Sequence, residues 1–194
     1  MKINRRGFSL GSSSLIITLL LGDRVVNLTP AEARAKNIPF RNLSRNQADL
    51  IDFLGDAIVP GAKISGLSHY IDHQLFAEPR NSLLILHYLG MNPPFDDFYI
   101  SSLKAFERTA REKYHKIASS LTPDEMTGFI TDMMQGNPDG WEVSGESVPA
   151  APFFYFVLRS DAIDVTYGTM AAFDYLEIPY MAHIEPVHPW KVKL

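Results

Sequence analysis

Two histidines spaced four residues apart are the best candidates for metal chemistry in this chain. His69 and His73 fall on one face of an expected helix, as paired zinc ligands do, and Asp72 lies between them. The glutamate of a zinc protease is missing from the pair, and the spacing identifies no third ligand. His183, near the C-terminus, is a further candidate for the same site. The structural alternative is a pair of satisfied or surface histidines, and the residues favour it.

The remaining sequence carries no common cofactor or nucleophile motif. It contains no Gly-x-Ser-x-Gly elbow, dinucleotide fingerprint or phosphate loop. The absence of cysteine excludes disulfides, thiolate zinc sites and cysteine-held haem or iron–sulfur clusters in this chain. Asp49, Asp52 and Asp56 recur along one helix, where an acidic face is usually solvated; only Asp56 is expected to brace the following turn. The sequence therefore predicts no catalytic residue, no cofactor and no metal in this chain.

Helical segments position these side chains. Apolar residues recur every three or four positions, and Ser44 with Gln47 and Thr122 with Glu125 have the capping-box pattern of helix starts. A short run of leucine and isoleucine is expected to be a buried helix. The expected helices span about 44–58, 66–76, 82–89, 95–120, 122–135 and 153–167. The fold prediction is an all-α domain of about six helices, without a sheet.

Three segments fall outside these helices. Residues 36–43 are expected to form a mobile arm, 141–151 an exposed polar loop, and 168–194 an extended, proline-rich C-terminal tail. Because the tail is rich in apolar side chains, we expect it to wrap its own domain or to bind a partner. The predicted partner contacts are Tyr175, Ile178, Tyr180, Met181, Ile184 and Trp190.

The N-terminus has the pattern of an export signal. Arg5, Arg6 and Phe8 precede a short apolar run at 15–21, and small residues follow. Paired arginines resemble the twin-arginine signal, which carries folded proteins across the bacterial inner membrane. The alternative is a secretory signal with two chance arginines. A membrane anchor is disfavoured, because a spanning helix needs about 20 apolar residues.

Two overlapping A-x-A sequences, ending at Ala33 and Ala35, place the expected boundary. Cleavage after Ala35 makes residues 1–35 the signal and 36–194 the mature domain. The removed part carries five basic and two acidic side chains, so the formal net charge changes from −4 to −7. An acidic domain argues against nucleic acid or an anionic membrane surface as the main partner.

Several short motifs resemble the gluconate 2-dehydrogenase subunit 3 family. They are the twin-arginine start, Leu54–Ala62 (LGDAIVPGA), Gly66–Asp72 (GLSHYID), Leu121–Glu125 (LTPDE) and the Phe153-Phe154 helix that leads to Tyr167-Gly168. The resemblance covers most of the mature chain. The stretch 178–184 differs from the Gly-rich ending of the family.

The resemblance implies a small non-catalytic subunit of a membrane-associated periplasmic dehydrogenase. The implied partner is a large flavoprotein that holds FAD and oxidises a sugar, sugar acid or polyol, often with a cytochrome c subunit that carries haem c. The small subunit is implied to assist folding and stability of the flavoprotein and to supply the signal read by the twin-arginine translocase. Two rivals remain: a stand-alone periplasmic metal-binding protein or enzyme using His69 and His73, and a helical adaptor for another exported oxidoreductase.

Overall fold

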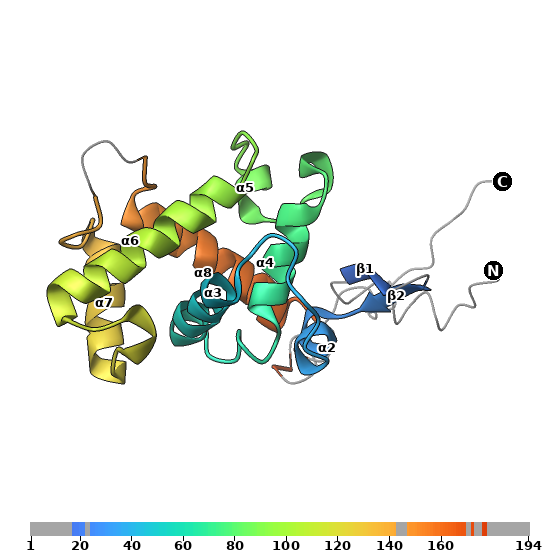
Figure 1. Ribbon diagram of the computed structural model, residues 1–194, viewed down its shortest axis with the longest axis horizontal. Coiled ribbons are helices and arrows are strands. Elements are labelled where there is room, and N and C mark those ends of the chain that lie inside the picture. Colours follow the sequence, from blue (N-terminus) through green and yellow to red (C-terminus); the bar gives the residue numbers. More distant parts are fainter. Residues whose placement is uncertain (1–16, 22–23, 143–146, 170–171, 173–175, 178–194) are drawn as a thin grey trace, which may run out of the picture.

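The computed structural model describes residues 17–21, 24–142, 147–169, 172 and 176–177. In these residues helices surround one hydrophobic core, and a two-stranded hairpin stands at the N-terminal side (Figure 1). The elements are β1 (Ile17–Leu21), β2 (Arg24–Leu28), α2 (Pro30–Ala35), α3 (Arg45–Ile58), α4 (Leu67–Phe76), η1 (Pro79–Asn81), α5 (Ile85–Tyr88), α6 (Asp96–Tyr114), η2 (Ala118–Ser120), α7 (Pro123–Gln135) and α8 (Ala151–Tyr167). The predicted all-α class is confirmed. In the described residues, no helix has the length and apolar character of a membrane span.

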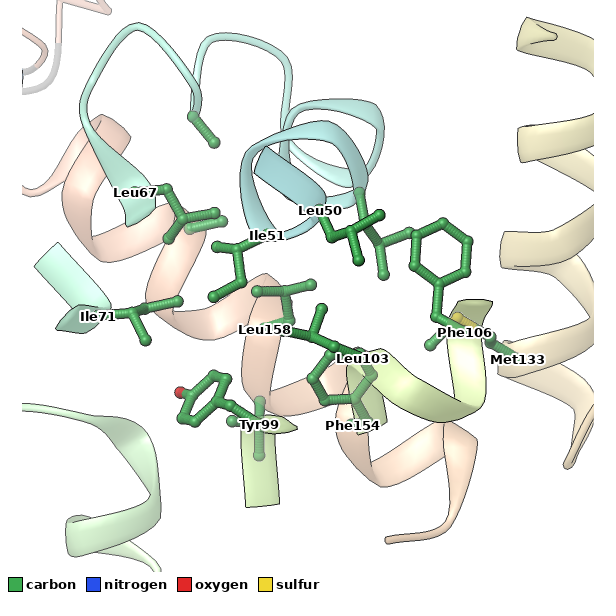
Figure 2. Packing of buried hydrophobic residues seen from close by; sticks show 14 of the residues in the cluster. Leu50, Ile51, Leu67, Ile71, Tyr99, Leu103, Phe106, Met133, Phe154 and Leu158 are labelled. Carbon is green, nitrogen blue, oxygen red and sulfur yellow. The ribbon is translucent and has the colours of Figure 1, made fainter. Parts of the chain in front are cut away.

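Helix α8 lies at the centre and packs against α3, α4, α5, α6 and α7. Figure 2 shows the meeting point of side chains from several helices, including Ile51 of α3, Leu67 of α4, Leu103 of α6 and Leu158 of α8. All four are almost fully buried, and each of these burials contributes about 1.5–3 kcal/mol of favourable transfer free energy. The core therefore depends on the helical periodicity that the sequence shows.

Local hydrogen bonds set the helix boundaries. The Ser44 hydroxyl accepts from the Gln47 amide, and the Thr122 hydroxyl accepts from the Glu125 amide, which confirms both predicted capping boxes. Helix α6 is shorter than predicted and ends at Tyr114. His115 follows with a φ of 55°, a left-handed conformation that stops the helix before the predicted end at Ser120.

The hairpin and helix α2 lie inside the region expected to be a signal peptide. Strands β1 and β2 pair antiparallel, with Ile17 opposite Leu28. No strand was predicted here, because the apolar run at 15–21 has the composition of a signal core. Helix α2 contacts both β2 and α4, so this region is joined to the helical domain.

Residues 36–43 do not form the predicted free arm but lie against α4. The carboxylate of Asp72 accepts hydrogen bonds from three consecutive backbone amides, those of Arg41, Asn42 and Leu43, at 2.9–3.1 Å. Leu43 joins the hydrophobic core. The prediction of a mobile arm is wrong because the holding group lies on a helix about 30 residues further along the chain.

The segment that begins at Trp141 was predicted to be exposed, and this is wrong for Trp141 itself. Its ring is completely buried between Phe129 of α7 and Phe154 of α8. The indole Nε1 donates to the Pro149 carbonyl at 2.8 Å, which satisfies the one polar atom of the ring. The prediction of exposure followed from the polar residues that surround Trp141 in the sequence, which do not show that its ring is buried.

Asp161 is a buried carboxyl that joins three helices. It lies on α8, accepts the hydroxyl hydrogen of Tyr99 on α6, and accepts the Ile85 amide at the start of α5 at 3.0 Å. Burial raises the pKa of Asp161 to about 7, while these two hydrogen bonds act in the opposite direction.

Because of this raised pKa, the contribution of Asp161 to the free energy of unfolding should decrease as the pH rises from about 4 to about 7. In that range Asp161 ionises in the unfolded chain but keeps its proton in the folded chain, so unfolding releases a proton and stability decreases as the pH rises. Above about pH 7 this group adds no further change. Each unit of pKa displacement corresponds to about 1.4 kcal/mol.

Asp161→Asn should therefore flatten the pH profile of the melting temperature, because the amide does not titrate and its oxygen still accepts from the Ile85 amide. Thermal unfolding followed by circular dichroism from pH 4 to pH 8 measures this effect. Asp139→Asn, at an exposed site, is the control and should keep the wild-type slope. An unchanged slope in Asp161→Asn would contradict the assignment.

Candidate functional site

The two candidate metal ligands lie one turn apart on α4. His69 is buried, its Nε2 lies 3.1 Å from the Ile38 carbonyl oxygen, and its ring contacts Phe40 at 4.5 Å between centroids. Since a carbonyl only accepts, Nε2 carries the hydrogen. Burial lowers the pKa of His69, which favours the neutral ring. His69 therefore holds the segment that precedes α3.

His73 is half-buried and lines a very small cavity that also borders His69 and Asp72. Asp72 directs its carboxylate at the amides of 41–43. Within the described part of the chain, no group of three or more histidine, aspartate or glutamate side chains has a metal-site arrangement. His183 lies outside the described residues.

Asp52 and Asp56 on α3 also bind parts of their own chain. Asp52 was expected on a solvated face, but it is buried, forms an ion pair with Arg34 of α2 and accepts the Ser68 amide at 3.1 Å. The prediction for Asp56 is confirmed: it accepts the amides of Gly61 and Lys63 at 3.1 and 3.0 Å. Both acids stabilise backbone geometry.

An open cavity of about 440 Å³ lies between α2 and α3. Charged side chains of both signs line it, yet they pair with each other, Arg34 with Asp52 and Arg45 with Asp49. The charges in this cavity are therefore already neutralised within the chain.

Five of the exposed large apolar side chains of the described chain lie between residues 76 and 91. We call the five side chains Phe76, Leu83, Tyr88, Leu89 and Met91 the apolar rim. Their exposed fractions range from 40% to 67%. Exposed large apolar side chains that form a contiguous patch mark interaction surfaces, so this stretch is a candidate for one. These five side chains lie between the end of α4 and the start of α6, within α5 and on both sides of it (Figure 1).

Buried polar side chains fix the backbone of the apolar rim. The Leu83 amide donates to the side-chain oxygen of Gln74 at 2.7 Å, and the Leu83 carbonyl accepts from the Tyr70 hydroxyl at 2.9 Å. Two residues later, Asp161 accepts the Ile85 amide. The backbone at Leu83 is therefore held with the Leu83 side chain outward, and such preorganisation reduces the entropy cost of binding.

A groove of about 510 Å³ continues from the rim. Met91 belongs to both, and the groove is lined by Phe98 of α6, Phe153 of α8 and Val148. Lys104 and Asp97 supply charges at its edge. A mostly apolar groove with a few charged groups fits an apolar segment of another protein.

The sequence prediction missed the apolar rim. The stretch 82–89 was expected to be a nearly all-apolar buried helix, whereas α5 has only four residues and, of the apolar side chains in the stretch, just Leu84 and Leu86 are fully buried. A run of leucine and isoleucine has no polar face, so its periodicity carries no information about orientation. No local signal distinguishes the buried from the exposed members.

The other predicted sites lie outside the described residues. These are the targeting residues Arg5, Arg6 and Phe8, and the predicted partner contacts Tyr175, Ile178, Tyr180, Met181, Ile184 and Trp190. They stay predictions.

Comparison with known families gives one match. A family model described as gluconate 2-dehydrogenase subunit 3 matches residues 45–179, from the first residue of α3 past the end of α8. Comparison with curated proteins found no match, and neither did comparison with solved structures. The matched part contains Asp52, Asp72, Asp161 and all of the apolar rim and groove, whereas α2 and the segment to Ser44 precede it. Since the match covers most of the chain and the helical fold agrees with the sequence motifs, the chain belongs to the gluconate 2-dehydrogenase subunit 3 family.

Proposed function

We propose that this chain is the non-catalytic small subunit of a membrane-associated periplasmic dehydrogenase complex. Its main partner is a large subunit that holds FAD and oxidises a sugar, sugar acid or polyol. A cytochrome c subunit with haem c passes the electrons on. The small subunit assists the folding and stability of the flavoprotein and provides the export signal for both.

The observation that carries the proposal is the exposed apolar rim in a chain whose family is described as a subunit. A large apolar area in water is unfavourable by about 25 cal/mol per Å², so covering it with a partner is favourable. The rim and its groove are the surface of the described residues that best fits the large subunit. The tail residues around Tyr180 are a predicted second contact.

The buried acids support a non-catalytic role. Asp52, Asp72 and Asp161 are the buried carboxyl groups of the described residues, and each binds backbone amides of its own chain. A general acid or base must instead reach a substrate atom within hydrogen-bond distance. These acids support the fold that presents the rim.

The twin-arginine pattern supports the export part of the proposal. A flavoprotein folds around FAD before it crosses the inner membrane, so a folded pair needs the route that accepts folded proteins. The small subunit carries Arg5 and Arg6 and therefore directs the complex of both subunits to the periplasm.

Substitution in the rim should weaken the complex. Tyr88→Asp places a charge at the most exposed rim side chain, and removing a central aromatic anchor from an interface costs about 2 kcal/mol or more, roughly a thirtyfold loss in affinity. The measurement is an affinity pull-down of the tagged chain from its native membranes, with an absorbance spectrum of the eluate. The wild-type eluate should contain a large subunit with bound flavin, and the variant eluate should lose it.

Ile117→Asp is the matched control, because Ile117 is also an exposed apolar side chain but lies between α6 and α7. It should keep the flavin. Equal flavin in Tyr88→Asp and wild type would eliminate the rim as the interface. A wild-type eluate that holds this chain alone, with stoichiometric metal, would instead favour the metal-binding rival at His69 and His73.

Export should depend on the paired arginines. Arg5→Lys with Arg6→Lys keeps the positive charge but removes the guanidinium pair, so both subunits should accumulate in the cytoplasm. Fractionation of cells, with dehydrogenase activity measured in each fraction, tests this expectation. Lys2→Arg is a control that leaves the pair intact. Normal periplasmic activity of the double variant would refute the targeting role.

A further inference from the structure

Both predicted cleavage sequences lie in helix α2. Ala31, Ala33 and Ala35 are all within Pro30–Ala35, and the Ala33 side chain is 1% exposed, packed in a small cluster with Ile17 and Leu28. Peptidases act most readily on exposed, flexible chain, so a peptide bond in a docked helix is accessible only after the helix separates from the domain.

The start of α2 is fixed by a complete capping box. The Thr29 hydroxyl accepts the Glu32 amide at 3.1 Å, and the Glu32 carboxylate accepts the Thr29 amide at 2.8 Å. These hydrogen bonds hold the pKa of Glu32 below its ordinary value. A helix of six residues is marginal in isolation, so contacts with the domain must supply the rest of its stability.

An ion pair joins α2 to the helical domain. Arg34 pairs with Asp52 of α3, whose side chain is only 4% exposed. Asp52 also accepts the Ser68 amide of α4, so one carboxylate links α2, α3 and α4. Cleavage after Ala33 would divide this helix before Arg34, and cleavage after Ala35 would remove Arg34 and leave the Asp52 charge buried without its cation, a costly arrangement.

The turn before α4 is shaped to receive the first turn of α2. Gly66 has a φ of 86°, and a Cβ at this position would lie 2.2 Å from the Pro30 carbonyl oxygen. Only glycine permits this close backbone approach. Past α2, the Ile38 carbonyl contacts His69 and Asp72 holds the amides of 41–43, so contacts with the domain recur along the segment from Thr29 to Leu43.

We propose that residues 29–43 stay in the folded domain after export, because docking of α2 buries Ala33, the residue that both A-x-A sequences share, and keeps the two cleavage sequences in a helix that signal peptidase does not accept. The retained domain then begins at Thr29 or earlier and not at Lys36. Folding of α3 and α4 creates the docking site, so the chain protects these sequences once it has folded.

Limited digestion of the purified full-length chain with trypsin tests the docking, with cut positions identified by mass spectrometry. The Arg34–Ala35 bond lies in α2, and the Arg80–Asn81 bond is an internal reference because the Arg80 side chain is 80% exposed. The Arg34–Ala35 bond of the wild type should be cut at least about tenfold more slowly than the reference. Equal rates would overturn the proposal.

Two variants separate docking from general unfolding. Asp52→Asn removes the partner of Arg34 and should accelerate the Arg34–Ala35 cut about tenfold relative to Arg80–Asn81, whereas Asp49→Asn, on the exposed side of the same helix, should not. If Asp52→Asn unfolds the chain and accelerates every cut, Thr29→Ala provides the test, because it removes only the cap at the start of α2. Thr29→Ala should accelerate the Arg34–Ala35 cut several-fold relative to the Arg80–Asn81 cut. No selective increase in either variant would overturn the proposal.

The mass of the exported chain gives an independent outcome. We expect an N-terminus at or before Thr29, and a start at Arg34 or Lys36 would overturn the proposal. If no protein reaches the periplasm, only the export role of Arg5 and Arg6 is contradicted. The docking of α2 is still tested by the trypsin experiment, which uses purified chain and does not depend on export.

Discussion

Buried carboxylates bound to backbone amides hold the irregular parts of this protein to its helices. Asp72 accepts three consecutive amides from a segment that has no helix or strand of its own. Asp161 does the same for the first amide of α5, and Asp52 for the second residue of α4. A buried backbone amide without a partner is costly, so each of these acids makes possible a chain path that regular secondary structure does not supply. The helices pack through apolar side chains, and hydrogen bonds to the buried aspartates hold the segments between the helices.

This division explains which features the sequence predicted. The capping boxes at Ser44 and Thr122 use partners three residues away, and the helix faces repeat every three or four residues, so both are visible in a short window. The partners of Asp72 lie about 30 residues away, and Asp161 and Ile85 are 76 residues apart. Their residue types are those of an ordinary solvated helix face, and only the folded chain shows that they are buried.

The candidate interface was unpredictable for a related reason. The four consecutive apolar residues from Leu83 to Leu86 have no polar position that would show which side chains are buried. In the structure Leu84 and Leu86 are buried, whereas Leu83 is exposed. The orientation is set by Gln74, Tyr70 and Asp161, which hold the backbone on both sides of Leu84. Three polar groups inside the domain thus place the Leu83 part of the candidate interface. The residues that form it and the residues that position it are different sets.

The same separation applies to the N-terminal boundary of the domain. The family match begins at Arg45, but the groups that receive the preceding segment, Asp52, Gly66 and Asp72, lie within the match. A boundary drawn from signal-peptide composition ends at Ala35, in the middle of the contacts that these groups make. The signal-peptide composition concerns export of the chain. The extent of the folded domain depends instead on which segments pair with its buried charges and backbone groups. By that physical criterion, the folded unit includes α2, and the Arg34–Asp52 pair is the contact that decides it.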